Sequence, residues 1–311
     1  MPRIISLVSS ATEIVYALGA EEWLVGRSHE CDYPAEVLAL PCCSRPQFDV
    51  VGNSAEIDLR VKSTLSSAVS IYEVLDDVLA ALQPTHILTQ TQCEVCAVSL
   101  GDVERSVASS LPSRPIVVSL KPDCLADIWE DIQRVADSIG LQTRGETLVS
   151  ELKGRIQRMS KLANDRQERP RVACLEWLSP LMAAGNWVPE LVGLAGGENL
   201  FGEAGKHSPW LSWDALRDAD PDVILAMPCG FDQRRTESEM YWLAEQPGYD
   251  ELKAVRSGKV FATDGSNFFN RPGPRIVESF EMLCEMIHGG LDPARHLHHH
   301  HYKKSNQEYE K

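Results

Sequence analysis

Short apolar runs alternate along the chain with longer stretches in which apolar residues recur every three or four positions. Runs of the first kind are typical of buried parallel strands, and stretches of the second kind are typical of amphipathic helices. Residues 4–8 form the first run, and Ile14, Val15 and Leu18 then share one face of a predicted helix that ends at Gly19. A strand followed by a helix in this way indicates a mainly parallel sheet with helices against its faces.

The same alternation continues to about residue 140 and restarts near residue 170. In the first half we expect strands at 23–28, 85–90 and 114–120, helices near 70–82 and over 124–140, and an irregular stretch at 41–54. In the second half we expect strands at 171–177, 222–228 and 257–265, and helices at 187–197, 212–219 and 275–289. The alternation in each half therefore predicts a separate α/β lobe.

A long polar stretch separates the two halves. Its apolar residues form a narrow stripe and no hairpin follows it, so we interpret it as one helix that connects the lobes. The predicted fold class is α/β, with two Rossmann-like lobes of mainly parallel sheets bridged by this helix. The predicted boundaries are 1–142 for the N-terminal lobe, 143–168 for the connecting helix, 169–292 for the C-terminal lobe and 293–311 for a disordered, His-rich tail.

Composition narrows the classes of partner. The formal net charge of −15 and the pI of about 5.1 disfavour nucleic acid and anionic membranes, because phosphate surfaces would repel the chain. No apolar stretch approaches the roughly 20 residues that span a bilayer, so we do not expect a membrane-embedded protein. The N-terminal apolar run is too short for a signal peptide, which predicts a cytoplasmic protein as the sequence is written, or a periplasmic one if the true start lies upstream. The nine cysteines, an odd number, then favour reduced thiols.

Residues that carry chemistry gather where the predicted strands end. Ligands of open α/β sheets bind at the carboxyl ends of strands, so these residues form the candidate site. The first lobe places there Ser10, His29, Glu30, Cys31, Gln92, Cys93 and Cys96, and the second lobe places there Glu176, Trp177, Trp187, Trp210, Phe231, Phe268, Phe269 and Arg271. One lobe thus offers thiols and an imidazole, and the other offers aromatic rings.

This asymmetry favours a large, partly flat ligand that carries a metal. Aromatic rings give contact area at a low cost in conformational entropy, and an imidazole or a thiolate can bind a metal axially. A single Trp near a strand end is more often a cap on the core. Six aromatic residues beside successive strand ends, however, favour a pocket.

The set His29, Cys31, Cys93 and Cys96 has the residue types and number of a tetrahedral zinc site or an iron–sulfur site. The two pairs are far apart along the chain and neither forms a known knuckle, so half-buried thiols and a hydrogen-bonded structural histidine remain the alternative. The sequence contains no P-loop and no GxSxG, HExxH or GxGxxG motif. Binding is therefore favoured over catalysis, and we expect no enzyme activity.

Four stretches of the chain carry a family resemblance. They are RIISLVSSATEIVYALGAEEWLVGRSHECDYP, GNWVPELVGLAGGENLF, SWDALRDADPDVIL and FFNRPGPRIVESFEML. Together they resemble the cobalamin-type substrate-binding proteins of ABC transporters, which are helical-backbone metal receptors with a class III periplasmic-binding-protein fold. Within that family the chain is most similar to the subgroup that carries SHECDYP and CEVCAVS. The resemblance spans about residues 3–290 and implies a ligand cleft between two lobes that one long helix bridges.

By position, the resemblance also implies the residues that face the ligand. Trp177, Trp187, Trp210 and residues 267–271 would face it from the second lobe, and Ser10 with the loops of His29 and Gln92 would face it from the first. Glu198 resembles the acidic residue that such receptors present to a permease.

We therefore expect a monomeric, non-enzymatic protein that binds cobalamin or another corrinoid, with haem and ferric chelates as neighbouring ligands and no required cofactor. It would serve an ABC importer, with a permease as partner, or would be a cytosolic relative that buffers or hands over the chelate. The alternative is a metal-dependent enzyme or metalloprotein that holds zinc or iron at the His29, Cys31, Cys93 and Cys96 cluster.

Overall fold

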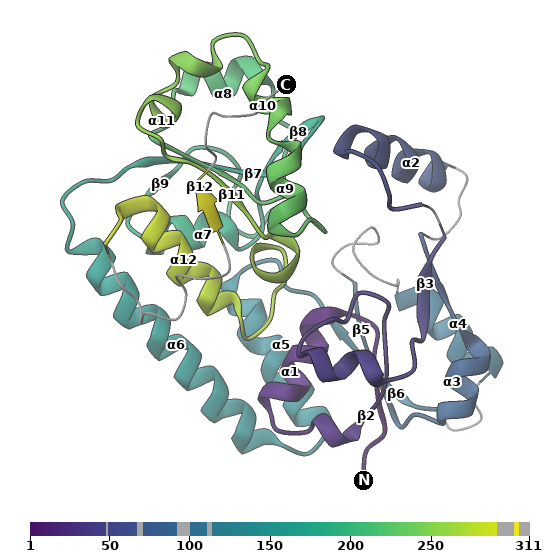
Figure 1. The fold of residues 1–311 in the computed structure, drawn as a ribbon. Helices are drawn as coiled ribbons and strands as arrows, with labels where there is room; N and C mark the ends of the chain where they lie inside the picture. Colours follow the sequence, from purple (N-terminus) through teal and green to yellow (C-terminus); the bar gives the residue numbers. More distant parts are fainter. Residues whose placement is uncertain (48, 67–70, 92–99, 111–113, 291–301, 305–311) are drawn as a thin grey trace. The chain divides into compact units, whose positions relative to one another are not determined.

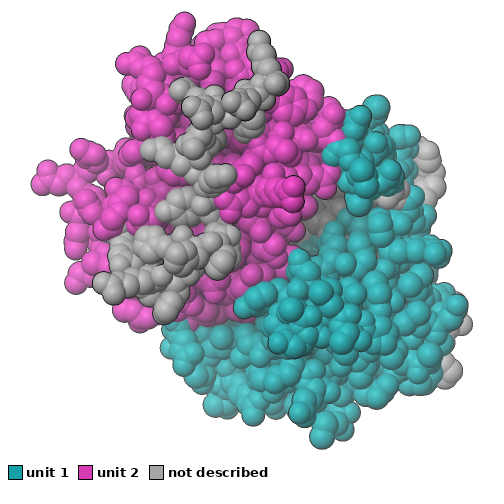
Figure 2. All heavy atoms as spheres, in the orientation of Figure 1, with its two compact units in different colours: residues 1–52, 56–122, 126–151 teal, residues 53–55, 123–125, 152–311 magenta. Residues whose placement is uncertain are grey.

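The computed structural model describes residues 1–47, 49–66, 71–91, 100–110, 114–290 and 302–304. The chain divides into two compact units, which Figure 2 shows in teal and magenta. Unit 1 comprises residues 1–52, 56–122 and 126–151, and unit 2 comprises residues 53–55, 123–125 and 152–311. Within the described residues, no helix combines the length and the apolar character that crossing a membrane requires.

Unit 1 is built on a parallel sheet whose described strands follow the order β2-β1-β5-β6 (Figure 1). These strands are β1 (Ile4–Ser6), β2 (Leu24–Arg27), β5 (His86–Gln90) and β6 (Ile116–Leu120), and an antiparallel ribbon is formed by β3 (Ser44–Pro46) and β4 (Tyr72–Val74). The helices are α1 (Ser9–Ala17), α2 (Ser54–Ser66), α3 (Asp76–Leu82), α4 (Leu100–Ser110) and α5 (Leu125–Ser138), with 3₁₀ turns at Glu21–Trp23 and Ala35–Ala39.

Burial on both faces explains the continuous apolar runs of this sheet. Every residue of β1 and β5 is buried. On one face, Ile5 and Ile87 pack against Leu79 of α3 and Val103 of α4. A parallel strand that is covered on both sides has no solvent-facing positions, so it shows no apolar–polar alternation.

Unit 2 holds a second sheet, in which the described strands follow the order β12-β11-β10-β7-β8 with β9 beside β7. Strands β7, β10 and β11 are parallel, whereas β8 and β12 run antiparallel to their neighbours. The strands are β7 (Arg171–Leu178), β8 (Leu181–Ala183), β9 (Glu198–Asn199), β10 (Val223–Ala226), β11 (Val260–Thr263) and β12 (Tyr302–Lys304). The helices are α7 (Val188–Leu194), α8 (Trp213–Ala219), α9 (Gln233–Glu239), α10 (Tyr241–Ala244), α11 (Lys253–Arg256) and α12 (Ile276–His288), with a 3₁₀ turn at Tyr249–Glu251 and a π-helical turn at Gly265–Phe269. The core on one face joins Leu175, Ile224 and Ala262 of the sheet to Leu216 of α8 and Leu243 of α10.

The predicted connecting helix is α6 (Gln142–Asn164). Near its start, Arg144 Nη1 donates to the carbonyl oxygen of Leu18 in unit 1 at 3.0 Å. Farther along, the Arg155 guanidinium donates to both carboxylate oxygens of Glu281 on α12 in unit 2, at 3.2 and 2.8 Å. Each half of α6 is thus fastened inside one unit by an arginine.

The structure differs from the sequence-based expectations at several elements. The expected helix near 70–82 is a strand, β4, followed by the shorter helix α3, and the stretch expected to be irregular at 41–54 contains β3, which pairs with β4. Helices α2, α4, α9, α10 and α11 and strands β8 and β9 were not predicted. Within the tail that we expected to be disordered, the described residues 302–304 form β12 against β11.

Candidate functional site

The carboxyl ends of β1, β2, β5 and β6 lie at one edge of unit 1, because these strands are parallel. α1 begins at this edge with Ser9 and Ser10, and the loop after β2 carries His29 and Glu30. Ser9 Oγ donates to the carbonyl oxygen of Glu30 at 2.8 Å, which joins helix and loop. Ser10 is buried in the first turn of α1. The predicted residues of the first lobe that the structure describes are therefore neighbours at one sheet edge.

His29 is held by the β3–β4 ribbon. Its Nδ1 lies 2.8 Å from Oγ of Ser44 in β3, and its ring centroid lies 5.0 Å from that of Tyr72 in β4. Its Nε2 is 3.9 Å from Oε1 of Glu30, and its side chain keeps 21% of its surface exposed. Burial, with a smaller effect of the nearby Arg27, lowers the pKa of His29 to about 4.

The imidazole of His29 is consequently neutral at physiological pH. A serine hydroxyl can both donate and accept, so Ser44 satisfies Nδ1 in either ring tautomer. In the tautomer that carries its proton on Nδ1, Nε2 has the free electron pair that a metal ion requires. His29 can therefore serve as a neutral nitrogen ligand without losing its hydrogen bond to Ser44.

Cys31 faces the interior of unit 1. The residue is 0% exposed, and its Sγ lies 3.0 Å from Thr12 Oγ1 and 3.2 Å from Ser28 Oγ. These contacts fasten the His29 loop to the start of α1. Cys31 thus has a packing role that its sequence position did not reveal.

The four-residue metal cluster stays a prediction. Gln92, Cys93 and Cys96 lie outside the described residues. Within the described part of the chain, no group of three or more His, Cys, Asp or Glu side chains is arranged to hold a metal ion. The seven cysteines described there form no disulfide, and burial raises the pKa of Cys43, beside this loop, to about 12.

In unit 2 the corresponding sheet edge carries an aromatic cluster. The ring of Phe231, which follows β10, lies 5.1 Å from that of Trp177 at the end of β7. The guanidinium carbon of Arg235 on α9 lies 4.0 Å from the centroid of the same Phe231 ring. Phe231 itself is 2% exposed, so Trp177 and Arg235 present more surface at this edge than the ring between them.

Trp177 and Trp210 point to the same face of the sheet. Trp177 of β7 pairs with Met182 of β8, and Met182 forms an antiparallel bridge to Trp210. Side chains of directly paired residues project to one side, so the three side chains form a row, which we call the Trp177–Met182–Trp210 row. Trp210 is 58% exposed, and neither Trp177 nor Met182 is fully buried. An exposed indole of this size at a strand end is an expected contact surface for a flat ligand.

The other predicted residues of the second lobe lie in the interior. Trp187 is buried and donates its Nε1–H to the carbonyl oxygen of Phe269 at 2.9 Å. Phe268 is buried with Arg275 5.0 Å from its ring centroid, and Arg271 is buried with its Nε donating to the carbonyl oxygen of Ser266 at 3.0 Å. These residues hold the segment after β11 in place, and direct ligand contact by them stays a prediction.

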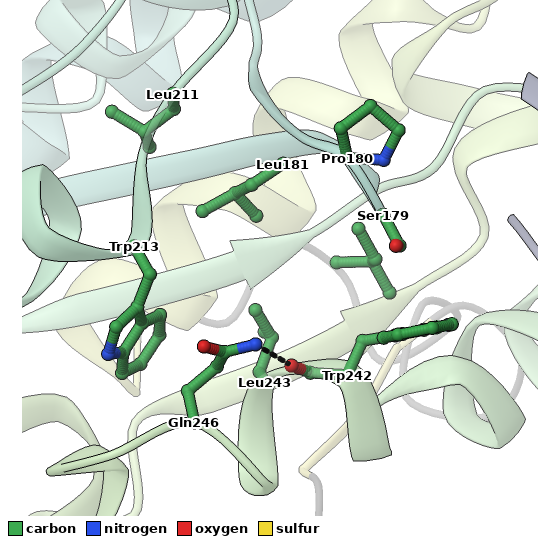
Figure 3. A pocket seen from close by; sticks show the side chains of 9 residues that line it. Ser179, Pro180, Leu181, Leu211, Trp213, Trp242, Leu243 and Gln246 are labelled. Carbon is green, nitrogen blue, oxygen red and sulfur yellow. Dashed lines mark hydrogen bonds between the residues drawn. The ribbon is translucent and has the colours of Figure 1, made fainter. Parts of the chain in front are cut away.

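Unit 2 also contains a small apolar cavity of about 230 Å³ (Figure 3). It is lined by Leu178, Ser179, Pro180, Leu181, Leu211, Trp213, Trp242, Leu243 and Gln246, none of which was a predicted site residue. Pockets for drug-sized ligands measure about 300–1,000 Å³, so this cavity is too small for a corrinoid or a haem.

Sequence reasoning missed four residues of these surfaces. They are Ser44, Tyr72, Met182 and Arg235. Only Arg235 left a signal, since it follows Phe231 by four residues, close enough along the chain for the two side chains to meet. The others reach the site through strand pairings between distant segments.

Comparisons with known proteins agree with the fold. Residues 4–266 match the family of periplasmic binding proteins. The vitamin B12-binding protein of Vibrio cholerae is 24% identical over 286 residues, which cover 92% of this chain and 88% of that protein. The uncharacterized ABC transporter substrate-binding lipoprotein YvrC of Bacillus subtilis is 21% identical over 295 residues, which cover 92% of this chain and 80% of that protein. The solved structure of the periplasmic heme-binding protein RhuT from Roseiflexus sp. RS-1 in apo form is 22% identical, with a TM-score of 0.67 over 93% of this chain and 99% of that one.

These matches correct the expected location. The prediction of a cytoplasmic protein is wrong, because the matched family is one of periplasmic binding proteins and the similar proteins include a lipoprotein. The finding points to a location outside the cytoplasm. The short N-terminal apolar run therefore did not indicate the location of the protein. A location outside the cytoplasm also gives no reason to expect reduced cysteines.

Proposed function

Because the chain belongs to the periplasmic binding protein family, we propose that it is the substrate-binding component of an ABC importer and that it binds a corrinoid or a related metal chelate. Relatives named for vitamin B12 and a structural neighbour named for heme support the class of metal chelates. The proposed partner is a membrane permease, to which the exposed Glu198 would dock. The proposed role is binding without catalysis.

The observation that carries the choice of a metal chelate is the neutral imidazole of His29. Its Nδ1 lies 2.8 Å from Ser44 Oγ, its pKa is lowered to about 4, and its side chain keeps 21% of its surface exposed. A neutral imidazole fixed through one nitrogen is a good axial ligand for cobalt or iron through the other. We therefore propose that His29 Nε2 coordinates the metal of the chelate.

Aromatic contact from unit 2 supports the same class of ligand. The Trp177–Met182–Trp210 row offers indole and thioether surface on one face, and Arg235 adds a positive charge beside Phe231. Indole surface binds the flat apolar part of a macrocycle, and a guanidinium binds carboxylate or phosphate groups at its rim. Corrinoids and haem both combine these two features.

The experiment is a titration of the full chain with diaquocobinamide, cyanocobalamin and haemin, followed by absorbance and calorimetry. Diaquocobinamide has exchangeable axial positions, so coordination by His29 should shift its absorption bands, and His29→Ala should remove the shift while leaving weaker binding. His288→Ala removes a histidine of α12 that belongs to neither proposed contact surface and is the matched control. Absence of heat and of any spectral change with all three ligands would overturn the proposal.

The metalloprotein alternative has no support from the described residues, since Cys31 is buried against Thr12 and Ser28. Metal analysis of the purified chain after removal of its His-rich tail tests that alternative. About one tightly held zinc or iron per chain would favour it over the chelate receptor.

A further inference from the structure

Glu176 occupies an unusual place in the sheet of unit 2. β7 and β8 pair Leu175 with Ala183 and Trp177 with Met182, so two steps along β7 correspond to one step along β8. Glu176 is therefore the extra residue of a β-bulge. A bulge turns the side chains that follow it relative to those before it. Here it gives Trp177, rather than Glu176, the position opposite Met182.

The carboxylate of Glu176 is hydrogen-bonded to the segment that carries Trp210. Ser208 Oγ donates to Glu176 Oε2 at 2.7 Å, and Gly185 N donates to Ser208 Oγ at 3.0 Å. Ser208 is buried, although both its neighbours in sequence are exposed. Burial raises the pKa of Glu176, and the hydrogen bond from Ser208 opposes that rise. The half-buried side chain of Glu176 is thus an acceptor for the Trp210 segment.

Backbone contacts leave little freedom to this segment. Ala183 N donates to Pro209 O at 2.9 Å, and Asn186 N donates to Lys206 O at 2.7 Å. A Cβ atom on Gly185 would lie 2.5 Å from Lys206 O. The segments that carry Gly185 and Lys206 therefore approach more closely than a side chain at position 185 allows. Ser208 is the point where a side chain, rather than the backbone alone, fixes the segment to β7.

We propose that Glu176 is a positioning residue: through the bulge and its hydrogen bond to Ser208, it holds Trp177 and Trp210 in one row with Met182 as the ligand platform of unit 2. That this row contacts a ligand rests on the proposed function. The positioning itself is a property of the chain alone. The side-chain carboxyl of Glu176 provides the acceptor for Ser208. The backbone carbonyl of the same residue accepts from Cys229 N at 3.1 Å, so Glu176 also ties the platform to the segment after β10.

The first test is ¹⁹F NMR of protein labelled with 5-fluorotryptophan. Trp210→Phe and Trp177→Phe assign the two resonances. Glu176→Ala should move the Trp210 resonance and leave the Trp213 and Trp242 resonances in place. Ser208→Ala should produce the same change. Glu176→Gln should largely preserve the native Trp210 resonance, because its amide oxygen still accepts from Ser208. Glu203→Ala removes an exposed carboxylate from the same loop and is the matched control. An unmoved Trp210 resonance in both Glu176→Ala and Ser208→Ala would overturn the proposal.

The second test is a double-mutant cycle with diaquocobinamide. Glu176→Ala should weaken binding by about 5- to 10-fold, and in a Trp210→Ala background it should weaken binding by less than about 2-fold, because the residue it positions is already absent. Full additivity would contradict a positioning role. If no chelate binds at all, the proposed function fails, whereas the ¹⁹F spectra still decide whether Glu176 positions Trp210.

Discussion

The pH dependence of metal-chelate binding gives the sharpest prediction, because a proton and a metal compete for Nε2 of His29. With the ordinary histidine pKa of 6.5, the neutral fraction would fall from ~0.76 at pH 7 to ~0.03 at pH 5, and the affinity would fall about 25-fold. With the pKa of His29 lowered to about 4, the neutral fraction stays near ~0.9 at pH 5 and the affinity changes only about 1.1-fold. The buried ring therefore predicts binding that is almost independent of pH in this range.

The assay measures the dissociation constant of diaquocobinamide at pH 7, 6 and 5 for the native chain and for His29→Ala. The ratio of the two constants at each pH cancels every titration except that of His29. We expect this ratio to stay within about twofold, which follows from the near-constant neutral fraction. A fall of more than about tenfold between pH 7 and pH 5 would refute the reasoning about burial, and a ratio of one at pH 7 would refute coordination by His29.

The same lowered pKa predicts how stability depends on pH. The unfolded chain takes up a proton on His29 near pH 6.5 and the folded chain near pH 4, so this contribution to stability is present above pH 6.5 and is lost as the pH falls to about 4. Full linkage would amount to ~3 kcal/mol, and because the ring keeps contact with solvent we expect about 1–2 kcal/mol. Urea unfolding of the native chain and of His29→Ala measures the difference, and equal slopes with pH would contradict the expectation.

Three further substitutions test the packing that supports the site, each by chemical unfolding. Gly185→Ala should lower the free energy of unfolding by about 1–3 kcal/mol, because the new Cβ would lie 2.5 Å from Lys206 O and 2.7 Å from Ser208 N. Gly193→Ala, in open space on α7, is the control and should be neutral or stabilising. Equal effects of the two substitutions would refute the close approach at Gly185. Arg155→Met should cost about 1–3 kcal/mol by leaving the largely buried Glu281 carboxylate without its guanidinium, and Arg158→Met, on the exposed side of the same helix, should cost less than about 0.5 kcal/mol. Trp187→Phe should lower the free energy of unfolding by about 2–3 kcal/mol, since the carbonyl oxygen of Phe269 loses its donor. The native indole of Trp213 is partly exposed, so Trp213→Phe should cost less. The reverse order would contradict the assignment of Trp187 to the core.

The sequence predicted the parallel strands well, because their signal is local. Residues 4–6, 86–90 and 172–175 are largely apolar and fully buried in a sheet, and they lie in β1, β5 and β7. The segment around Tyr72 misled the prediction because its apolar residues fit a helix as well as a strand. Pairing of Tyr72 and Val74 with Pro46 and Ser44 decides for the strand, and a partner 26 to 30 residues away leaves no local signal.

The candidate site could be predicted only in its outline for the same reason. The strand-end rule depends on topology alone, and His29 and Trp177 do lie where β2 and β7 end, whereas Trp210 lies in a loop that bridges to β8; whether they contact a ligand stays a prediction. Which aromatic residues are exposed depends on packing, and Trp187 and Phe268 are in the interior although their sequence surroundings resemble that of Trp210. A bulge such as the one at Glu176 is a mismatch between two strands, so no single stretch of sequence records it.

In each unit, the parallel strands place the candidate residues at one edge of the sheet, and an antiparallel element, the β3–β4 ribbon or β8, orients their side chains. His29 is oriented by Ser44 of β3, and Trp210 is oriented by its bridge to Met182 of β8. Tyr72 and Val74 of β4 are also core residues, whereas Ser44 and Met182 are not members of the core clusters, so substitutions at these two positions should alter ligand preference while the sheets stay folded. Ser44→Ala illustrates the consequence: it removes the partner of Nδ1, so it should weaken coordination of a metal by His29 without unfolding the sheet of unit 1.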